Sequence, residues 1–400
     1  MRLYLTALNP TDSVLDGFLP AAARLGLPVT VLTDQPDAWP TSPEQRSGAE
    51  VSGADVRDVR GVLDAVHRGG EPPVALLSNS DHLQTPTALA AAYLGLPGKD
   101  WRATLRSKDK LLTRRTVADA GLDRVAVLAL GPEDPPERAA TVPFPAVVKP
   151  REGVASEDVY LVDGMPELRR RVAEIRARRP GQGLLVEEYL AGDLHTLETI
   201  GDGNSTAVLG GWRTSLGPPP TFTEEALDWA PDLPAPVLAQ VLAQLDALGV
   251  GFGACHTEFV VSGGRARLVE VNYRLIGDRV DLVMADLLDL PLFAHVIRIH
   301  SGEPLPALPH PVSLNRHARV EWVCATRSGT LVAAPGPVDA TGPAGVLLGS
   351  RPLRTVGVTA PLTGTNRDYL AALHAIGPDP RSVRDALRDL RATHRWKIEG

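Results

Sequence analysis

Three polar residues stand at alternate positions in an otherwise apolar segment of the chain. The run LVEVNYR places Glu270, Asn272 and Arg274 two residues apart. Alternate side chains of a β-strand point to the same face, so these three are expected to face one way. Carboxylate and amide oxygens are ligands that Mg²⁺ accepts, and a guanidinium suits a planar oxyanion. The spacing therefore indicates metal-assisted chemistry on an anionic group.

A second apolar run, ACHTEFVV, comes before a Gly-Gly turn and repeats the pattern with His256 and Glu258 on one face. The two runs are expected to pair as antiparallel strands, which brings Glu258 and Glu270 to one register. A polar pair on a solvated face is the competing interpretation, although an unpaired carboxylate is costly in such apolar strands. The residues alone leave both interpretations open.

The lysines are few and their positions are informative. The chain has five lysines against 36 arginines, and a lysine kept in such a chain indicates a place that needs a compact ammonium group. Lys149 ends an apolar strand, and a loop of small residues with Gly153, Ala155 and Ser156 follows it. The backbone N–H groups of such a loop suit a phosphate. Lys110 opens a helix and, taken by itself, is a solvated helix residue.

The composition excludes several classes of protein. A net charge of −7 without a lysine-rich tail does not suit a phosphate backbone, so nucleic acid is not expected as a partner. The two cysteines, Cys255 and Cys324, fit neither a disulfide framework nor a zinc site and are expected to be thiols in a reducing compartment. No run approaches the roughly 20 apolar residues of a membrane span, and no signal peptide is recognisable. A cytoplasmic enzyme is therefore expected.

The order of apolar segments predicts how the chain is organised. Residues 1–103 alternate short apolar strands with helices, which is typical of a parallel sheet, and no G-x-G-x-x-G follows the first strand. One helix is expected over 107–122 and another over 279–302. The proline-rich stretch 217–234 is expected to be an irregular loop. Beyond residue 310 the pattern changes to short alternating strands and a charged helix.

The order of these pieces resembles the ATP-grasp superfamily. Lys110 opens a helix that ends in Ala-Gly, and FPAVVKP, LLVEEYLAGD and HTEFVV…GGRARLVEVNYRLIGD follow it. The resemblance implies an α/β protein with α+β character in its nucleotide domain. It implies an N-terminal parallel pre-ATP-grasp unit (1–103), a two-subdomain ATP-grasp domain (104–309) with a lid over about 141–205, and a small C-terminal α+β unit (310–400).

The resemblance also implies roles for residues around the nucleotide. Lys110 and Lys149 would hold the phosphates of ATP, and the glycine-poor loop 151–157, with Ser156, would close over the γ-phosphate. His195 would lie near the ribose. The adenine edge would be contacted by Glu187 and by the backbone of Glu188, Tyr189 and Leu190.

For the metal and the substrates, the same resemblance implies a further set of residues. Mg²⁺ or Mn²⁺ would be held by Glu258, Glu270 and Asn272, and Arg274 would stabilise the phosphoryl and acyl-phosphate states. Candidates for binding substrate charge are Arg213, Asp278 and Arg279. The alternative for each of these last three is a local salt bridge.

Enzymes of this superfamily mostly activate a carboxylate as an acyl phosphate, which an amine then attacks with release of ADP and phosphate. Such chemistry needs positioning and charge neutralisation rather than a side-chain nucleophile. HTEF, EVNYRLIGD and TFTEEALDWAPDLP look more like the ligases that make dipeptides, carnosine-like compounds and siderophore or other secondary-metabolite amides. We therefore expect an ADP-forming amide or peptide ligase that acts on an amino acid or small polycarboxylate, with small-molecule partners only.

Two other functions stay open at this level. One is a nucleotide-binding regulatory or assembly module without turnover. The other is a biotin-carboxylase-like enzyme that forms carboxyphosphate, although the chain lacks the long polyglycine loop, the acid–histidine pair and the biotin-attachment segment. The sequence also leaves open whether residues 310–400 cap the site or join two copies in a homodimer.

Overall fold

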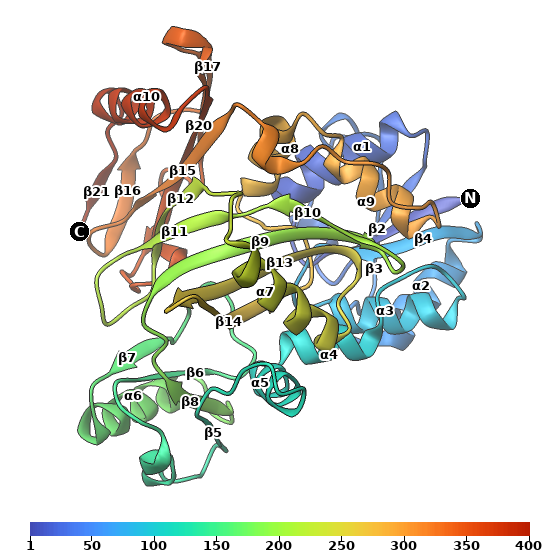
Figure 1. Ribbon diagram of the computed structural model, residues 1–400. Coiled ribbons are helices and arrows are strands. Elements are labelled where there is room, and N and C mark those ends of the chain that lie inside the picture. Colours follow the sequence, from blue (N-terminus) through green and yellow to red (C-terminus); the bar gives the residue numbers. More distant parts are fainter.

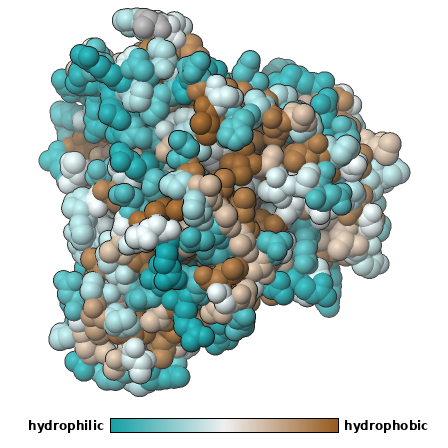
Figure 2. Space-filling view, viewed as in Figure 1, coloured by the Kyte–Doolittle hydropathy of each residue, from teal (hydrophilic) through white to brown (hydrophobic). Residues whose placement is uncertain are grey.

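The computed structural model describes residues 1–343 and 345–400 in full, and its strands form four sheets. A long curved sheet crosses the centre of the molecule, the N-terminal unit (blue) lies to its right, and a small lobe (green) hangs below it (Figure 1). On the face seen in the space-filling view, hydrophobic and hydrophilic side chains are intermixed, and the small lobe lies at the lower left (Figure 2). Within the described residues, no helix is both long and apolar enough to span a membrane.

The N-terminal unit is a parallel sheet in the order β3-β2-β1-β4. Its strands are β1 (Arg2–Thr6), β2 (Val29–Thr33), β3 (Glu50–Gly53) and β4 (Pro73–Ser78). The helical segments beside it are η1 (Ser13–Phe18), α1 (Leu19–Arg24), α2 (Val59–Arg68) and α3 (Gln84–Tyr93). Every residue of β2 is buried, as expected for a strand covered by helices on both faces. The prediction of a parallel α/β unit is confirmed.

The small lobe is an antiparallel sheet in the order β5-β8-β6-β7, and one helix packs against it. Its elements are β5 (Val127–Leu130), β6 (Ala146–Pro150), β7 (Tyr160–Val162), α6 (Met165–Arg178) and β8 (Leu184–Glu188). Val148, Val172 and Val186 belong to its own apolar core. The lobe stands where a lid was expected, but its elements span 127–188 rather than 141–205, because the next strand belongs to the large sheet.

The large sheet has ten strands in the order β14-β13-β9-β11-β12-β15-β20-β18-β17, with β10 paired to β9. Its strands before residue 310 are β9 (Asp193–Asp202), β10 (Thr206–Gly210), β11 (Trp212–Leu216), β12 (Glu224–Trp229), β13 (Phe252–Ser262) and β14 (Arg265–Asn272). Its later strands are β15 (His317–Cys324), β17 (Val338–Thr341), β18 (Leu347–Pro352) and β20 (Tyr369–Gly377). Because β12 pairs with β15, the sheet continues into the C-terminal unit.

The prediction of an irregular loop over 217–234 was wrong in part, because this segment contains strand β12. Leu227 and Trp229 of this strand are buried. The strand is held by β11 on one side and by β15 on the other. The second partner lies far along the chain, so a local pattern does not reveal it. A small sheet of β16 (Gly329–Ala333), β19 (Thr359–Ala360) and β21 (Lys397–Glu399) completes the C-terminal unit.

Two of the expected helices are divided in the structure. The helix expected over 107–122 begins at Lys110, because Asp109 accepts hydrogen bonds from the N–H groups of Leu111 (3.0 Å) and Leu112 (3.2 Å) and caps it. The helix expected over 279–302 is interrupted at Pro291, which lacks an N–H group. The remaining helices are α4 (Trp101–Lys108), α5 (Lys110–Asp119), α7 (Ala235–Leu248), α8 (Val280–Leu288), α9 (Leu292–His300) and α10 (Pro380–Thr393).

Candidate active site

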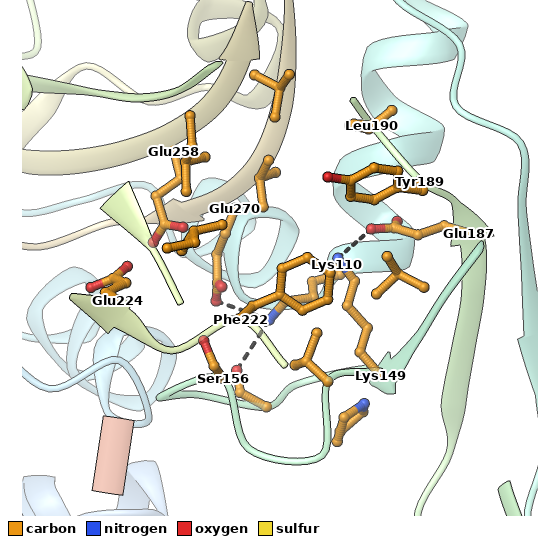
Figure 3. Close-up of a pocket in the computed structure, with 18 of the residues that line it drawn as sticks. Lys110, Lys149, Ser156, Glu187, Tyr189, Leu190, Phe222, Glu224, Glu258 and Glu270 are labelled. Carbon is orange, nitrogen blue, oxygen red and sulfur yellow. Dashed lines mark hydrogen bonds and ion pairs between the residues drawn. The ribbon is translucent and has the colours of Figure 1, made fainter. Parts of the chain in front are cut away.

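A cleft lies between the lid lobe and the large sheet (Figure 3). The space inside it amounts to about 930 Å³, part of which is open to solvent. Its apolar lining includes Val147, Leu190, Leu194, Phe222 and Val260. Its charged lining consists of Lys110, Lys149, Glu187, Glu188, Glu224, Glu258 and Glu270. The cleft therefore offers both apolar surface and charged groups to a ligand.

Glu258 and Glu270 are directly opposite each other in the antiparallel pair β13–β14. Opposed residues project from the same face, so both carboxylates line the cleft (Figure 3). Lys110 donates from Nζ to Glu270 Oε1 at 2.9 Å and to the carbonyl oxygen of Gly153 at 3.0 Å. Burial raises the pKa of Glu270, but Lys110 outweighs burial and holds this pKa below its usual value. The structure thus brings the predicted residues Lys110, Glu258 and Glu270 together. It also places them next to the loop between β6 and β7 of the small lobe, which is called the lid loop below.

Asn272 and His256 are opposed two positions further along the same two strands, and so lie on the same face as Glu258 and Glu270. Asn272 Nδ2 lies 3.4 Å from Glu258 Oε1. His256 lies between two carboxylates, with Nδ1 at 2.8 Å from Glu198 Oε1 and Nε2 at 3.4 Å from Glu258 Oε1. Burial lowers the pKa of His256, but Glu198 and Glu258 outweigh burial and raise it to about 10. The protonated imidazole therefore hydrogen-bonds to Glu198 and makes a longer ion-pair contact with Glu258.

Glu224 is a third carboxylate of the cleft, and the sequence reasoning missed it. It is the first residue of β12 and lies beside Glu258 (Figure 3). Burial, followed by the charge of Glu258, raises the pKa of Glu224 to about 8. The segment TFTEEALDW had been assigned to a loop, so Glu224 was not placed on a face.

Lys149 and Glu187 form a buried ion pair at the lid side of the cleft. Arg114 of α5 also binds Glu187, with Nε at 2.9 Å and Nη2 at 3.1 Å from the two carboxylate oxygens. Burial raises the pKa of Glu187, but Arg114 and then Lys149 outweigh it and lower the pKa to about 2. Burial lowers the pKa of Lys149. The carboxylate expected to read adenine is thus engaged by two cations of the protein.

The backbone expected to contact adenine lies at the end of β8 and lines the cleft. The N–H group of Glu188 donates to the Ala126 carbonyl at 2.9 Å, and that of Tyr189 to the Pro145 carbonyl at 3.0 Å. These two donors are therefore engaged within the lid. The Glu188 carboxylate accepts from Arg267 Nη2 at 2.7 Å. Leu190 supplies an apolar wall to the cleft.

Arg274 joins the end of β14 to the N-terminal unit. Its Nη2 donates to Asp81 Oδ2 at 2.6 Å, and Asp81 lies in the loop after β4. Burial lowers the pKa of Arg274, but Asp81 outweighs burial and raises it. Lys108, another residue that the sequence reasoning missed, has a buried Nζ without a hydrogen-bond partner in the described part of the chain. Burial lowers the pKa of Lys108, and Asp81 and Glu270 oppose this effect.

His195 and Arg213 lie away from the cleft. Leu194 lines it, and the next residue of β9 points to the opposite face. There His195 stacks on Phe259 with ring centroids 6.0 Å apart. Arg213 is paired directly opposite His195 and shares its face. The expected ribose contact of His195 and substrate contact of Arg213 are therefore not part of this site.

Arg279 and Asp278 differ in their surroundings. Arg279 Nη1 lies 3.3 Å from an oxygen of Asp12 and 3.0 Å from one of Asp16, so it makes a local salt bridge to the N-terminal unit. Asp278 is exposed, and its charge contributes to the raised pKa of Arg274. Asp278 thus stays a substrate-site candidate at the edge of the site, whereas Arg279 is engaged elsewhere.

The donor atoms at the carboxylate end fit a hard divalent cation. Over the described residues, no three His, Cys, Asp or Glu side chains form a ready-made metal cage. Mg²⁺ keeps several waters and takes phosphate oxygens, so it needs few protein ligands. Glu258, Glu270 and Asn272 offer such oxygens from one face.

The chain has the ATP-grasp fold over its whole length. The L-amino acid ligase of Bacillus licheniformis superposes with a TM-score of 0.82 at 19% identity, covering 100% of this chain and 99% of that one. The biotin carboxylase of Campylobacter jejuni, in complex with an ATP analogue, superposes with a TM-score of 0.71 at 15% identity, covering 99% and 92%. Both comparisons support the fold and leave the reaction open.

Two curated proteins are similar in sequence. An uncharacterized protein of Sinorhizobium fredii, y4rH, is 26% identical over an alignment 349 residues long, which covers 83% of this chain and 70% of that protein. Carnosine synthase 1 of Gallus gallus is 30% identical over an alignment 279 residues long, which covers 62% of this chain and 30% of that protein. The similarity therefore spans less than a third of carnosine synthase 1. No protein-family model matches the chain.

Proposed function

We propose that the protein is an ATP-dependent, ADP-forming carboxylate–amine ligase. The observation that carries this proposal is the opposed pair Glu258 and Glu270 in a cleft that also receives Lys110 and Lys149. Paired carboxylates next to ammonium groups suit a triphosphate bound with a divalent cation. The ATP-grasp fold and the similarity to L-amino acid ligase and carnosine synthase 1 support the same class.

The cleft suggests how ATP would lie. Its apolar part, between Leu190 and Phe222, suits the adenine ring, and Lys110 and Lys149 lie where the triphosphate would extend. Ser156 lines the cleft from the loop of the lid and is assigned to the terminal phosphate. With the Glu187 carboxylate engaged by Arg114 and Lys149, we assign it to holding Lys149 in place, and adenine recognition to the chain at Leu190.

Glu258, Glu270 and Asn272 are the residues that would hold Mg²⁺, or Mn²⁺ in its place. The bound cation would neutralise phosphate charge during phosphoryl transfer. His256 would keep Glu258 oriented through its Nε2–H group. The role of Glu224 is to add a third carboxylate next to this pair.

In the proposed reaction, a carboxylate oxygen of the first substrate attacks the γ-phosphorus of ATP, the γ-phosphorus–oxygen bond breaks, and ADP leaves. The nitrogen of the second substrate attacks the carbonyl carbon of the acyl phosphate, phosphate leaves, and the nitrogen loses a proton. Arg274 is assigned to the charge on the transferred phosphoryl group. A thiol nucleophile has no part, because Cys255 is buried and does not line the cleft.

For the substrates, we propose an amino acid or small polycarboxylate as the acid and a small amine as its partner, in secondary-metabolite or siderophore synthesis. The names of the similar proteins, an L-amino acid ligase and carnosine synthase 1, support amino-acid substrates. Arg274 binds Asp81 of the N-terminal unit, and Lys108 interacts with both Asp81 and the cleft residue Glu270. We place the acid beside these residues.

A carboxyphosphate-forming enzyme is the second candidate, because the biotin carboxylase structure covers 99% of this chain. Release of ADP and phosphate from MgATP distinguishes the candidates when the protein is incubated with amino acids, citrate-like acids or bicarbonate, each with and without an amine. The ligase requires an acid and an amine and yields an amide detectable by mass spectrometry. Turnover with bicarbonate alone supports carboxyphosphate formation. Tight ATP binding without turnover in any mixture supports a nucleotide-binding module and contradicts the ligase.

A further inference from the structure

A short loop of the C-terminal unit contacts two walls of the cleft. The loop covers residues 363–368 and ends in η7 (Asn366–Asp368), directly before β20. The N–H group of Asn366 donates to the Ala155 carbonyl of the lid at 3.2 Å. Its side-chain Oδ1 accepts from the N–H group of Glu224 at 3.1 Å. One residue thus connects the lid loop, the strand that carries Glu224 and the C-terminal unit.

An ion pair also joins the C-terminal loop to the lid loop. Arg367 Nε donates to Glu157 Oε1 of the lid loop at 2.6 Å. Tyr369, which follows the loop, donates from its hydroxyl to the Glu224 carbonyl at 3.0 Å. The backbone of Glu224 is therefore held at its N–H group by Asn366 and at its carbonyl group by Tyr369. Arg367 of the same loop binds the lid loop.

The C-terminal loop is built to keep its shape. Asp368 is buried, and its carboxylate accepts from the N–H groups of Thr363 (3.0 Å) and Gly364 (2.6 Å) and from the hydroxyl of Thr363 (3.0 Å). The Thr365 side chain caps the turn by accepting from the N–H group of Arg367 at 3.1 Å. Such a network fixes the backbone conformation at Asn366 and Arg367 independently of their contacts with the lid loop.

The lid loop, by contrast, has a strained backbone. Ala155, Ser156 and Asp158 have φ angles of 57°, 55° and 58°, in the left-handed region that residues other than glycine adopt at a cost. A loop richer in glycine would adopt these angles freely. Contacts from outside the loop must therefore stabilise it, and Asn366 and Arg367 contact it at Ala155 and Glu157.

We propose that Asn366 and Arg367 are positioning residues, which hold the phosphate loop of the lid closed and align it with Glu224. This assigns residues 363–368 of the C-terminal unit to completing the nucleotide site from within the same chain. The inference rests on the proposed function for the identity of the ligand, ATP. The closure itself is measurable without any turnover.

The test combines amide hydrogen exchange over 153–158 with the affinity for a non-hydrolysable ATP analogue and Mg²⁺. Arg367→Met is expected to weaken the affinity about 2–5-fold and to speed exchange by a similar factor, and Asn366→Ala to do so about 5–10-fold. Arg367→Lys keeps the charge and should recover most of the affinity. Arg381→Met is the matched control, since Arg381 is 92% exposed in α10 of the same unit.

The contact with Glu157 gives a second, independent readout. Glu157 pairs with Arg367 and, through its other oxygen, with Arg179. Once Arg367→Met is present, adding Glu157→Gln should therefore weaken binding less than it does in the wild type, because the contribution of the Arg367 pair is already lost and only that of the Arg179 pair remains. Unchanged exchange and affinity in both Arg367→Met and Asn366→Ala overturn the proposal, as do fully additive effects at Glu157 and Arg367. If the wild type binds the analogue but forms no amide, the ligase proposal fails, and the exchange experiment still decides the positioning role.

Discussion

Glu258 and Glu270 face each other across the β13–β14 pair, and their carboxylates have different partners. Lys110 binds Glu270 at 2.9 Å, whereas the protonated His256 approaches Glu258 at 3.4 Å. Glu270 is therefore tied to a helix and the lid loop through Lys110, and Glu258 is tied to the interior of the sheet through His256 and Glu198. A cation placed between the two carboxylates would link both parts of the site.

Glu270→Gln is expected to abolish turnover, by about 100-fold or more, and to leave the fold intact. The amide keeps the size of the side chain but loses the charge that would attract a divalent cation. The measurement is ADP release as a function of Mg²⁺ concentration, together with the melting temperature. Glu225→Gln is the matched control, because Glu225 is a neighbouring exposed glutamate of β12. Undiminished activity of Glu270→Gln would remove the metal assignment.

The part of the site that follows from the sequence is the part built by local periodicity. Glu258 and Glu270 share a face because each alternates with apolar residues, and the Gly263–Gly264 turn brings their strands together. The N-terminal parallel unit follows from strand–helix alternation in the same way. The positions of Lys110 and Lys149 follow from the elements that they open and end.

The missed residues are brought to the site by contacts between distant segments. Asp81 reaches Arg274 across 193 residues, and Asn366 reaches Glu224 across 142. No periodicity within one segment encodes such contacts. His195 shows a related error, because a residue one position along a strand from the cleft wall points to the other face. Alternation separates the two faces, but the packing of the whole sheet decides which face meets the ligand.

Lys149→Ala is expected to weaken ATP binding about tenfold. The ammonium group is buried in the lid beside Glu187 and lies at the charged part of the cleft. The change should also lower stability by about 1–3 kcal/mol, since it leaves the buried Glu187 carboxylate with fewer partners. Calorimetric titration with ATP and a urea unfolding curve measure the two effects separately. Lys397→Ala, a change of an exposed lysine near the C-terminus, is the control. An unchanged nucleotide affinity would contradict the phosphate role of Lys149.

Lys108→Met is expected to weaken binding of the acid substrate without lowering the stability of the protein. The Lys108 ammonium group is buried without a hydrogen-bond partner among the described residues, and methionine fills a similar volume without a charge. Removing an unpaired buried charge should leave the melting temperature unchanged or raise it. If this ammonium awaits the acid substrate, the KM for the acid should rise about tenfold while the KM for ATP stays nearly constant. A lower melting temperature with an unaltered KM for the acid would assign Lys108 to the fold alone.

Asp281→Asn is expected to stabilise the protein more as the pH rises from 5 to 7. Asp281 is fully buried in α8, and burial raises its pKa from 3.8 to about 7, against hydrogen bonds from Ser13 and the N–H group of Leu282. Between these two values the native state holds a proton that the unfolded state has lost, so the stability of the wild type falls as the pH rises and levels off above about 7.

Asparagine cannot ionise and keeps a carbonyl oxygen for the N–H group of Leu282, which lies 2.9 Å from Asp281 Oδ1. The variant should therefore gain about 2–3 kcal/mol on the wild type between pH 5 and 7, at about 1.4 kcal/mol for each pH unit. Urea unfolding at pH 5, 6, 7 and 8 measures the difference. Asp289→Asn, at the exposed end of the same helix, should follow the wild type across this range. A constant difference between Asp281→Asn and the wild type at all four pH values would show that Asp281 is ionised in the native protein throughout this range.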